Sequence, residues 1–407
     1  MNERKKNKII NDPIYGFITL NDGVIFQIIK HPFFQRLRRI SQLGLSSLVY
    51  PGALHTRFQH AIGCMHLMEK SITEIRKKGH QITEEESESL KIAILLHDIG
   101  HSPFSHSLEN IIVQTPHEKL SLLFMEKLNN DLNQDLELAL LIFKNQYKKK
   151  FLHQLVSSQL DMDRLDYLKR DSFYSGVIEG NVGTDRIINM MNIADDKLVI
   201  EQKGIYSIEN FLIARRLMYW QVYLHKTVIS FEHTLIQTLK RAKQLIVKSK
   251  NSIFCTNELK YFLENNFNEE DFRRDSNLLL RFSSLDDHDI YYCLKQWCKE
   301  EDKVISILSR SIINRDPLKI IIRRTQFSHE DISKKKKNIM KEYKLSKAEV
   351  DYIVFTNKVS NSTYKYGKDD INILMKDGEI KNITDASDQF NIHALSKTIN
   401  KYFLCYP

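Results

Sequence analysis

The residues of this sequence that could do chemistry are histidines and aspartates, and they gather in three short segments. The segments are residues 55–66, 97–117 and 161–166 of a 407-residue chain. The pair His97-Asp98 follows a strongly apolar stretch, where a charged carboxylate is costly unless a cation or a metal ion pairs with it. Neutral imidazole and carboxylate groups suit Fe, Mn, Zn or Mg, and no neighbouring thiolate singles out zinc. The pair therefore indicates a divalent metal ion.

One ion needs more protein ligands than this pair supplies. His60 and Asp163 are the candidates, and they complete a set of two histidines and two aspartates with open positions for water and substrate. A metal ion held in this way lowers the pKa of bound water and neutralises charge on a phosphate. A lone His-Asp dipeptide is usually a polar pair at a helix end, so the hypothesis depends on the ordered set.

The composition favours a helical protein. The chain has only 13 glycines and 7 prolines, although sheet-rich folds need frequent turn residues. Hydrophobic residues make up 42% and charged residues 27%, which is typical of a folded globular chain. No apolar run approaches the ~18 residues that span a bilayer, so no membrane partner is expected. The 5 cysteines lack CxxC spacing, which argues against a disulfide scaffold and fits the cytoplasm.

Hydrophobic periodicity predicts the elements that position these segments. We expect helices over Ile62–Lys78, Thr83–His97, His117–Leu128, Asp135–Phe143 and Phe151–Leu160, and one or two long helices over Asn210–Lys250. The second of these begins at a capping box, Thr83-x-x-Glu86. We expect strands over Phe17–Leu20, Lys197–Gln202 and Ile320–Arg324, and a hairpin around Asp377-Gly378.

Longer motifs surround the chemical residues. They are Phe34-Gln-Arg-Leu-Arg-Arg, Gln42-Leu-Gly, Pro51-Gly-Ala-x-His55-Thr-Arg57-Phe-x-His60, Leu96-His-Asp-Ile-Gly-His-x-Pro-Phe-Ser-His106 and Asp161-x-Asp163-Arg-x-Asp166-Tyr167. In this order they resemble the HD-domain metal phosphohydrolases, and most closely their dNTP triphosphohydrolase branch, over about residues 9–226. The resemblance implies a mainly α fold with an HD-domain helical core (1–228), followed by a helical extension that completes the core and subunit contacts (229–328). After about residue 330 the sequence becomes rich in lysine and turn residues, which indicates a boundary near 328 and a smaller α+β C-terminal region (329–407).

The resemblance also implies the reaction. The ligands of a divalent ion (Mn, Fe, Mg or Zn) would be His60, His97, Asp98 and Asp163. Hydroxide held by this ion would attack the α-phosphorus of a dNTP and release a deoxynucleoside and inorganic triphosphate.

The leaving 5′-oxygen needs a proton, and His106 is the matching general acid. Glu109 lies three residues later, so on a helix it would share a face with His106 and favour the protonated imidazole. His101 and His117 match positions that touch the phosphates.

The remaining matched positions would bind substrate. Arg57 and Arg215 match the triphosphate clamps, and Arg164 follows the metal aspartate where mammalian members have lysine. Tyr167, Gln42, Leu43 and Asp171 match positions around the sugar, where a packed tyrosine and leucine leave no room for a 2′-hydroxyl. Tyr223 matches a residue near the base and the sugar.

Mammalian members of the branch also bind regulatory nucleotides at subunit interfaces. Asn11, Gln35 and Arg38 match that effector site, and Arg315 and Lys319 could hold an effector phosphate. Lys30 stands where the guanine-reading aspartate is found, and an ammonium cannot accept hydrogen bonds from guanine. Because the matched site lies between subunits, the resemblance implies a homo-oligomer, either a dimer or a tetramer. Because of Lys30, we expect any effector to differ from that of the mammalian members.

Two alternatives remain at this point. A formal net charge of +9 and the run Lys334–Lys337 permit an HD phosphohydrolase that acts on another nucleotide or on single-stranded nucleic acid. A nucleotide-sensing protein with little turnover would keep the pocket, but it would have no need of an acid such as His106. Release of triphosphate from dNTPs distinguishes the dNTP triphosphohydrolase from both alternatives.

Overall fold

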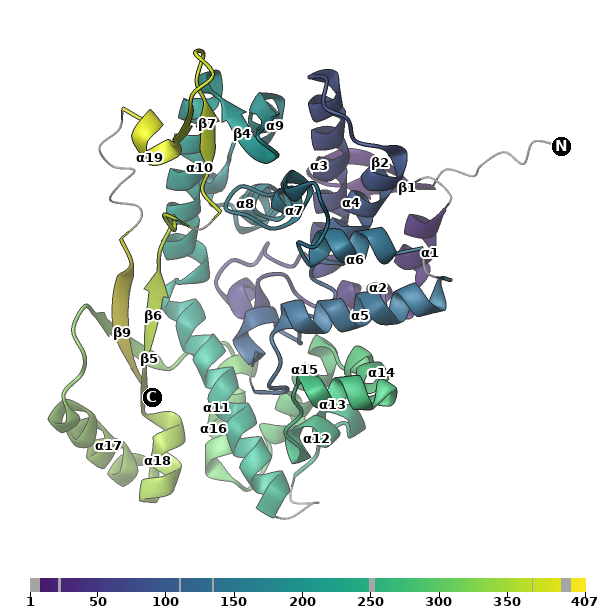
Figure 1. Ribbon diagram of the computed structural model, residues 1–407. Coiled ribbons are helices and arrows are strands. Elements are labelled where there is room, and N and C mark those ends of the chain that lie inside the picture. The colour runs from purple at the N-terminus through teal and green to yellow at the C-terminus, as the bar shows by residue number, and fades with distance from the viewer. Residues whose placement is uncertain are drawn as a thin grey trace.

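Helices form most of the chain, and three small sheets accompany them (Figure 1). The computed structural model describes residues 8–20, 23–109, 111–133, 135–248, 253–367, 369–388 and 397–407, and of His106 it describes the backbone alone. The predicted fold class, a helical core with a smaller α+β region at the C-terminus, is confirmed.

The centre of the core is the packed pair of α3 (Arg57–Lys77) and α4 (Glu84–Leu96). The predicted capping box begins α4, because the Thr83 hydroxyl accepts from Glu86 N at 3.1 Å and the Glu86 carboxylate accepts from Thr83 N at 2.9 Å. The apolar stretch at the end of α4 is fully buried. Helix α3 begins earlier than the predicted Ile62, because Thr56 and Gln59 form a second capping box.

Helix α8 (Met162–Ser175) packs against α3 at Gly63. A Cβ atom at Gly63 would lie 2.1 Å from Asp166 Oδ1 and 2.2 Å from Arg170 Nη2. Only glycine permits this approach. It brings the face of α8 that carries carboxylates beside the first turns of α3.

Shorter elements surround these three helices. The N-terminal elements are β1 (Lys8–Asp12), β2 (Gly16–Leu20), α1 (Val24–Lys30) and α2 (Pro32–Gln35). Between α4 and α8 lie α5 (His117–Asp131), α6 (Glu137–Phe143) and α7 (Lys150–Val156). Helix α7 ends before the predicted Leu160 because Ser157 is extended and the Asp161 carboxylate accepts from Ser158 N at 2.8 Å.

The predicted helical stretch Asn210–Lys250 consists of two helices. They are α10 (Ile205–Met218) and α11 (Lys226–Lys248), and a π-helical turn at Tyr219–Tyr223 separates them. Such turns are rare and often occur at functional sites. Before α10 come α9 (Thr184–Met190), β3 (Met191–Ala194) and β4 (Lys197–Glu201).

A second group of helices follows α11 and packs on it through α12 and α16 (Figure 1). The group comprises α12 (Asn257–Glu264), α13 (Glu269–Arg274), α14 (Ser276–Ser284), α15 (Asp287–Trp297) and α16 (Lys303–Ile313). The N-terminus of α15 also reaches the loops that lead into the HD core, since Arg36 Nε donates to Leu285 O at 2.9 Å. None of the described helices is long and apolar enough to cross a membrane.

The C-terminal residues join two sheets that begin earlier in the chain. These elements are β5 (Lys319–Arg323), α17 (His329–Tyr343), α18 (Lys347–Ile353), β6 (Phe355–Asn361), β7 (Asn372–Leu374), β8 (Ile380–Asn382), α19 (Ile383–Ala386) and β9 (Ile399–Tyr406). The sheet orders are β3-β4-β7-β8 and β5-β9-β6. Strands β7 and β8 form the predicted hairpin, with Gly378 at φ 88°. Both sheets therefore connect residues on either side of the boundary placed near 328.

Candidate metal centre

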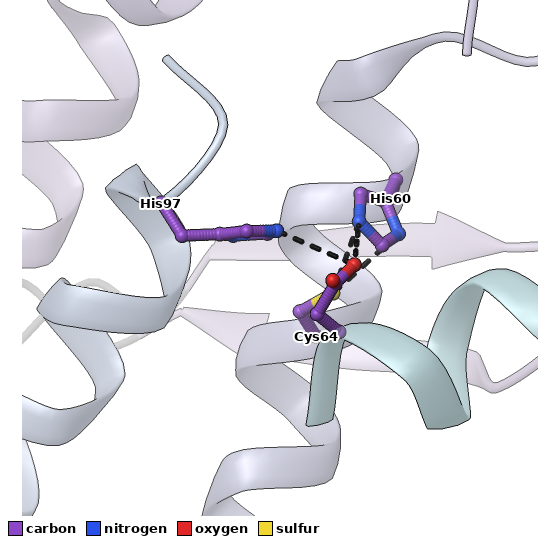
Figure 2. Close-up of side chains that lie close together, drawn as sticks. His60, Cys64 and His97 are labelled. Atoms are coloured by element: carbon purple, nitrogen blue, oxygen red, sulfur yellow. Dashed lines mark hydrogen bonds and ion pairs between the residues drawn. The ribbon is translucent and has the colours of Figure 1, made fainter. Parts of the chain in front are cut away.

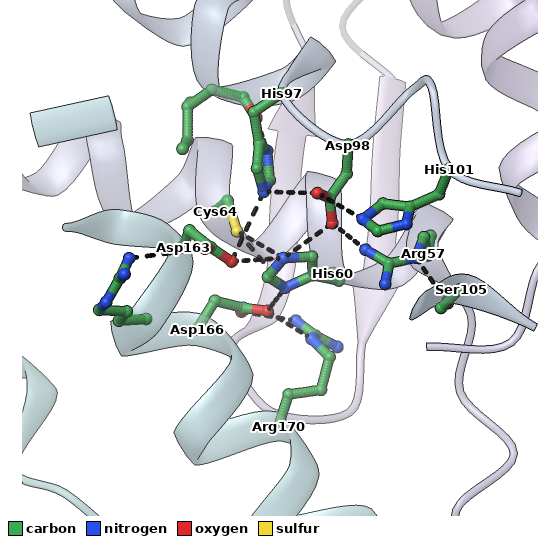
Figure 3. Close-up of polar contacts among 12 residues, drawn as sticks. Arg57, His60, Cys64, His97, Asp98, His101, Ser105, Asp163, Asp166 and Arg170 are labelled. Carbon is green, nitrogen blue, oxygen red and sulfur yellow. Dashed lines mark hydrogen bonds and ion pairs between the residues drawn. The ribbon is translucent and has the colours of Figure 1, made fainter. Parts of the chain in front are cut away.

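The four predicted ligands converge from three elements of the core (Figure 3). His60 lies in the first turn of α3, His97 caps the C-terminus of α4, and Asp163 lies in the first turn of α8. The Asp163 carboxylate lies 3.0 Å from His60 Nε2 and 3.5 Å from His97 Nε2. Asp98 completes the group, 3.4 Å from His97 Nε2 and 3.6 Å from His60 Nε2.

Buried partners orient both imidazoles. His60 Nδ1 bonds to Asp166 Oδ2 at 2.7 Å, and His97 Nδ1 bonds to the carbonyl of Ile94 at 2.6 Å. If each Nδ1 carries the proton, each Nε2 presents a lone pair to the centre, which is how metal-bound histidines are held in proteins. His97 Nε2 is buried and has no hydrogen-bond partner among the described residues. An ion in the centre would supply one.

The electrostatics of the centre favour a cation. Burial raises the pKa of Asp98, but the Arg57 guanidinium and the imidazoles nearby lower it well below its usual value. Burial lowers the pKa of His97, but Asp98 and Asp163 raise it above its ordinary value. Two ionised carboxylates beside two imidazole nitrogens form a donor set that suits the divalent metals predicted above.

Cys64 is a neighbour that the sequence analysis missed. Its thiol lies one turn after His60 on α3, 3.5 Å from His60 Nδ1 (Figure 2). Burial raises the pKa of this thiol well above its usual value, so the group is protonated and a weak ligand. The i,i+4 spacing from His60 was the signal available in the sequence.

A second cluster adjoins the metal centre through Asp98. His101 Nε2 lies 3.3 Å from Asp98 Oδ1, and the His101 ring stacks on His117 with centroids 3.9 Å apart. Burial, and then the neighbouring Arg57, lower the pKa of His101 well below its usual value. His117 Nδ1 bonds to the Glu109 carboxylate.

The side chain of His106 lies outside the described residues. Its backbone is part of the 3-10 turn Ser105–Leu108, which Glu109 directly follows. The dyad of His106 and Glu109 therefore stays a prediction.

Of the three predicted phosphate-binding arginines, Arg57 and Arg164 pair with aspartates of the metal centre, whereas Arg215 bonds to the C-terminal region. Arg57 is buried, donates from Nε to Ser105 Oγ at 2.8 Å, and pairs with Asp98. Arg164 donates to Asp161 Oδ2 at 2.5 Å, and Arg215 donates to the carbonyl of Thr363 at 2.8 Å. The Nε atoms of Arg164 and Arg215 are buried without a hydrogen-bond partner among the described residues. Both arginines raise the local positive potential that a polyphosphate requires.

Three of the predicted substrate-binding residues, Tyr167, Asp171 and Tyr223, form a second group farther along α8. The rings of Tyr167 and Tyr223 meet edge to face with centroids 6.1 Å apart. Tyr223 Oη donates to Asp171 Oδ2 at 2.7 Å. The backbone N–H of Gln42 donates to the carbonyl of His55 at 3.0 Å, and the side-chain Oε1 of Gln42 is buried without a partner among the described residues. Leu43 follows it and packs, half-buried, against the core.

Comparison with known proteins identifies the family. The model of the HD domain matches residues 57–171, and that of the HD associated region matches residues 182–255. A solved phosphohydrolase from Bacteroides thetaiotaomicron VPI-5482 is similar over 99% of this chain and 100% of its own, with a TM-score of 0.95 and 51% sequence identity. The chain belongs to the HD-domain phosphohydrolases. The predicted membership is therefore confirmed.

Curated relatives of this HD phosphohydrolase fall into two groups. The uncharacterized protein YwfO of Bacillus subtilis is 31% identical over 399 residues, which are 94% of this chain and 88% of the relative. The SAMHD1-like deoxynucleoside triphosphate triphosphohydrolase of Dictyostelium discoideum is 32% identical over 264 residues. That match covers 60% of this chain and 51% of the relative, so it spans about half of the longer protein.

His55 of this HD phosphohydrolase contacts the predicted substrate-binding residue Asp171, and the sequence analysis gave His55 no role. His55 Nε2 bonds to Asp171 Oδ1 at 2.8 Å, and its ring stacks on Tyr174 with centroids 4.5 Å apart. His55 and Tyr223 thus hold one oxygen each of the Asp171 carboxylate. The position of His55 inside the motif that ends at His60 was the available signal.

The residues matched to an effector site have contacts with residues other than the four predicted ligands. Gln35 donates to the carbonyl of Ile29 at 2.6 Å, and Arg38 donates to Gln35 at 2.9 Å. Lys30 lies over the Phe26 ring, and Arg315 donates to the carbonyl of Leu48 at 2.7 Å. The remaining two residues considered for this site, Asn11 and Lys319, are exposed. An effector and a dimer or tetramer stay predictions.

Proposed function

We propose that this HD phosphohydrolase hydrolyses deoxynucleoside triphosphates to deoxynucleosides and inorganic triphosphate. The observation that carries the proposal is the arrangement along α8. Asp163, Tyr167 and Asp171 follow one another at i, i+4 and i+8, so a metal ligand, an aromatic ring and a carboxylate share one face of the helix. A substrate lying along this face would place its phosphates at the metal centre and its sugar against Tyr167. The activity named for the Dictyostelium relative supports the same substrate.

The chain supplies defined groups for the reaction. His60, His97, Asp98 and Asp163 would hold the metal ion, which when bound activates water and offsets phosphate charge. Arg164 and Arg215 would bind the polyphosphate, because each has a buried N–H that no described residue accepts. His101 would offer a neutral imidazole to a phosphate oxygen, in accord with its lowered pKa.

Proton delivery to the leaving 5′-oxygen is assigned to His106. The turn that carries it joins Arg57 through the Ser105 hydroxyl, so the acid and the phosphate clamp belong to one connected structure. Glu109 would support the acid directly, or act through His117, to which its carboxylate bonds.

Sugar selection is assigned to the group formed by Tyr167, Asp171 and Tyr223. Tyr167 is held by Tyr223, and Tyr223 is held by Asp171. A ribose 2′-hydroxyl against the Tyr167 ring would lose its water without gaining a partner. The Asp171 carboxylate has acceptor capacity beyond its two bonds, which suits a 3′-hydroxyl.

Product analysis tests the proposal. The purified protein is incubated with each dNTP and each rNTP in Mn²⁺ or Mg²⁺, with and without a second dNTP, and the products are resolved. We expect deoxynucleoside and triphosphate in equal amounts. Release of orthophosphate or pyrophosphate would contradict the proposal, and so would equal turnover of ribonucleotides.

A further inference from the structure

Asp287 is a buried carboxylate that lies outside both family matches and binds two loops of the HD core. It is the first residue of α15 and is 3% exposed. Asp287 Oδ2 accepts from the backbone N–H of Ser41 at 2.8 Å, and Oδ1 accepts from the backbone N–H of Phe104 at 2.8 Å. One side chain thus connects the loop that begins Ser41-Gln42-Leu43 with the loop that follows the His-Asp pair.

The two loops also bond to each other next to the metal centre. Ser105 Oγ donates to the carbonyl of Ser41 at 2.7 Å and accepts from Arg57 Nε at 2.8 Å. Arg57 in turn pairs with the metal ligand Asp98, as Figure 3 shows. A continuous chain of contacts therefore leads from Asp287 to Asp98.

The loop held by Asp287 has an unusual backbone. Phe104 and Ser105 have φ angles of 54° and 57°, a region that residues with a side chain rarely adopt unless the surroundings impose it. Helix α15 makes two contacts that hold this loop in place. The Asp287 carboxylate holds the Phe104 amide, and the Tyr291 ring, one turn along, packs edge to face on the Phe104 ring with centroids 5.1 Å apart.

We infer that Asp287 is a positioning residue for phosphate-ester hydrolysis, acting through the loops at Ser41 and Phe104. It touches no reacting group. It fixes the distance between the side of the pocket that carries Gln42 and the side that carries Arg57 and the Ser105 turn. The inference deepens the proposed function and rests on it for the choice of substrate.

Asp287→Asn tests the inference because an amide has one oxygen where the carboxylate has two. Its NH₂ group would face one of the two N–H donors, so one of the two loops would be released. We expect faster deuterium exchange at the Ser41 and Phe104 amides and a fall in kcat of tenfold or more. Bound metal should stay at the wild-type level, since all four ligands remain. KM should change less than kcat, because the released loops shift the reacting geometry more than the polyphosphate contacts.

Asp286→Asn is the matched control. Asp286 precedes α15, accepts from His288 N at 3.0 Å and pairs with Arg39, but it does not bond to Ser41 or Phe104. It should lower the melting temperature as Asp287→Asn does and keep kcat within twofold of wild type. An equal loss of kcat in both variants would assign the effect to the stability of α15 and overturn the inference.

A second variant keeps the test decisive if Asp287→Asn does not fold. Ser105→Ala removes the hydroxyl that joins Arg57 to Ser41 and leaves α15 intact, so it should also lower kcat with little change in melting temperature. Wild-type kcat in Ser105→Ala, or unchanged amide exchange in a folded Asp287→Asn protein, would overturn the inference. Absence of dNTP turnover in the wild-type protein would instead contradict the proposed function. Amide exchange at Ser41 and Phe104 would still show whether Asp287 restrains the two loops.

Discussion

Two regions of the candidate site use residues of helix α8, yet they are built from different interactions. They are the proposed metal end (His60, His97, Asp98 and Asp163) and the proposed sugar end (Tyr167, Asp171 and Tyr223). At the metal end, charged groups are buried together, and each imidazole is oriented by a second buried partner, as His60 is by Asp166. At the sugar end, the aromatic rings of Tyr167 and Tyr223 pack together, and one carboxylate, Asp171, anchors them.

This difference predicts how each end responds to substitution. A buried ion-binding site works only when the full donor set and its partners are present, because each missing group leaves others uncompensated. A packed wall loses contact area in proportion to the atoms removed. Substitutions at the metal end should therefore abolish the reaction, whereas those at the sugar end should change its selectivity.

The largest effect is expected from loss of a metal ligand. His97→Ala or Asp98→Ala should reduce turnover to background and lower bound metal, while helical circular dichroism stays close to wild type. His80→Ala is the control, because it removes an imidazole that bonds to Asn192 away from the centre. Full activity of either ligand variant in metal-free buffer would contradict the assignment of the centre.

Loss of the Glu109 charge should come next. Glu109→Gln keeps the size but removes the carboxylate that would favour a protonated imidazole, and positioned acid–base groups are typically worth ~10²–10⁴-fold in rate. A fall in kcat would indicate action through His106, whereas a rise in KM would indicate action through His117. Glu118→Gln is the control, since Glu118 also lies near His117, at 3.5 Å, but is 65% exposed. Unchanged kinetics, with chemistry shown to limit the rate, would leave Glu109 a structural residue.

Local sequence signals account for more of the candidate metal centre than of the proposed sugar-binding group. The four ligands lie in short motifs whose order is informative, and α4 was predicted because its capping box and its apolar stretch are local signals. The short strand β7 pairs with β4 in parallel, across more than a hundred residues of chain, and no local pattern in the sequence encodes that partner.

Some neighbours of the candidate site residues could not be found from the sequence, whereas others could. Asp287 has no motif around it, and its proposed role depends on where the N-terminus of α15 lies in the folded protein. Cys64 and His55 were within reach, because one lies a helical turn after His60 and the other lies inside a quoted motif. Motif order indicates the four candidate ligands but not the side chains that orient them.

A smaller effect is expected from the partner that orients His60. Asp166→Asn should weaken metal binding about 10–100-fold, as loss of such outer partners typically does. Burial raises the pKa of Asp166, but Arg170 and His60 lower it to about 2, so the wild-type group is ionised at neutral pH. Asp12→Asn is the matched control, because Asp12 also bonds to Arg170, at 2.9 Å, but the structure shows no bond from it to His60. Equal metal affinity in the two variants would contradict a role for Asp166 at the metal.

The smallest effect on rate, but the clearest on selectivity, is expected at Tyr167. A ribose 2′-hydroxyl would be buried against the Tyr167 ring without a partner, which costs on the order of 1–3 kcal/mol before any clash, or roughly 5- to 150-fold in kcat/KM. Tyr167→Ala should open space there and narrow the ratio of kcat/KM between matched dNTP and rNTP pairs, with a modest loss of kcat through poorer positioning. Tyr167→Phe keeps the ring against Tyr223 and should keep the preference for dNTPs over rNTPs. This variant therefore separates the effect of ring packing from that of the Tyr167 hydroxyl. If Tyr167→Ala and wild type discriminate equally, the sugar end is not where selection occurs, and the broader activity on other nucleotides becomes the better explanation of the pocket.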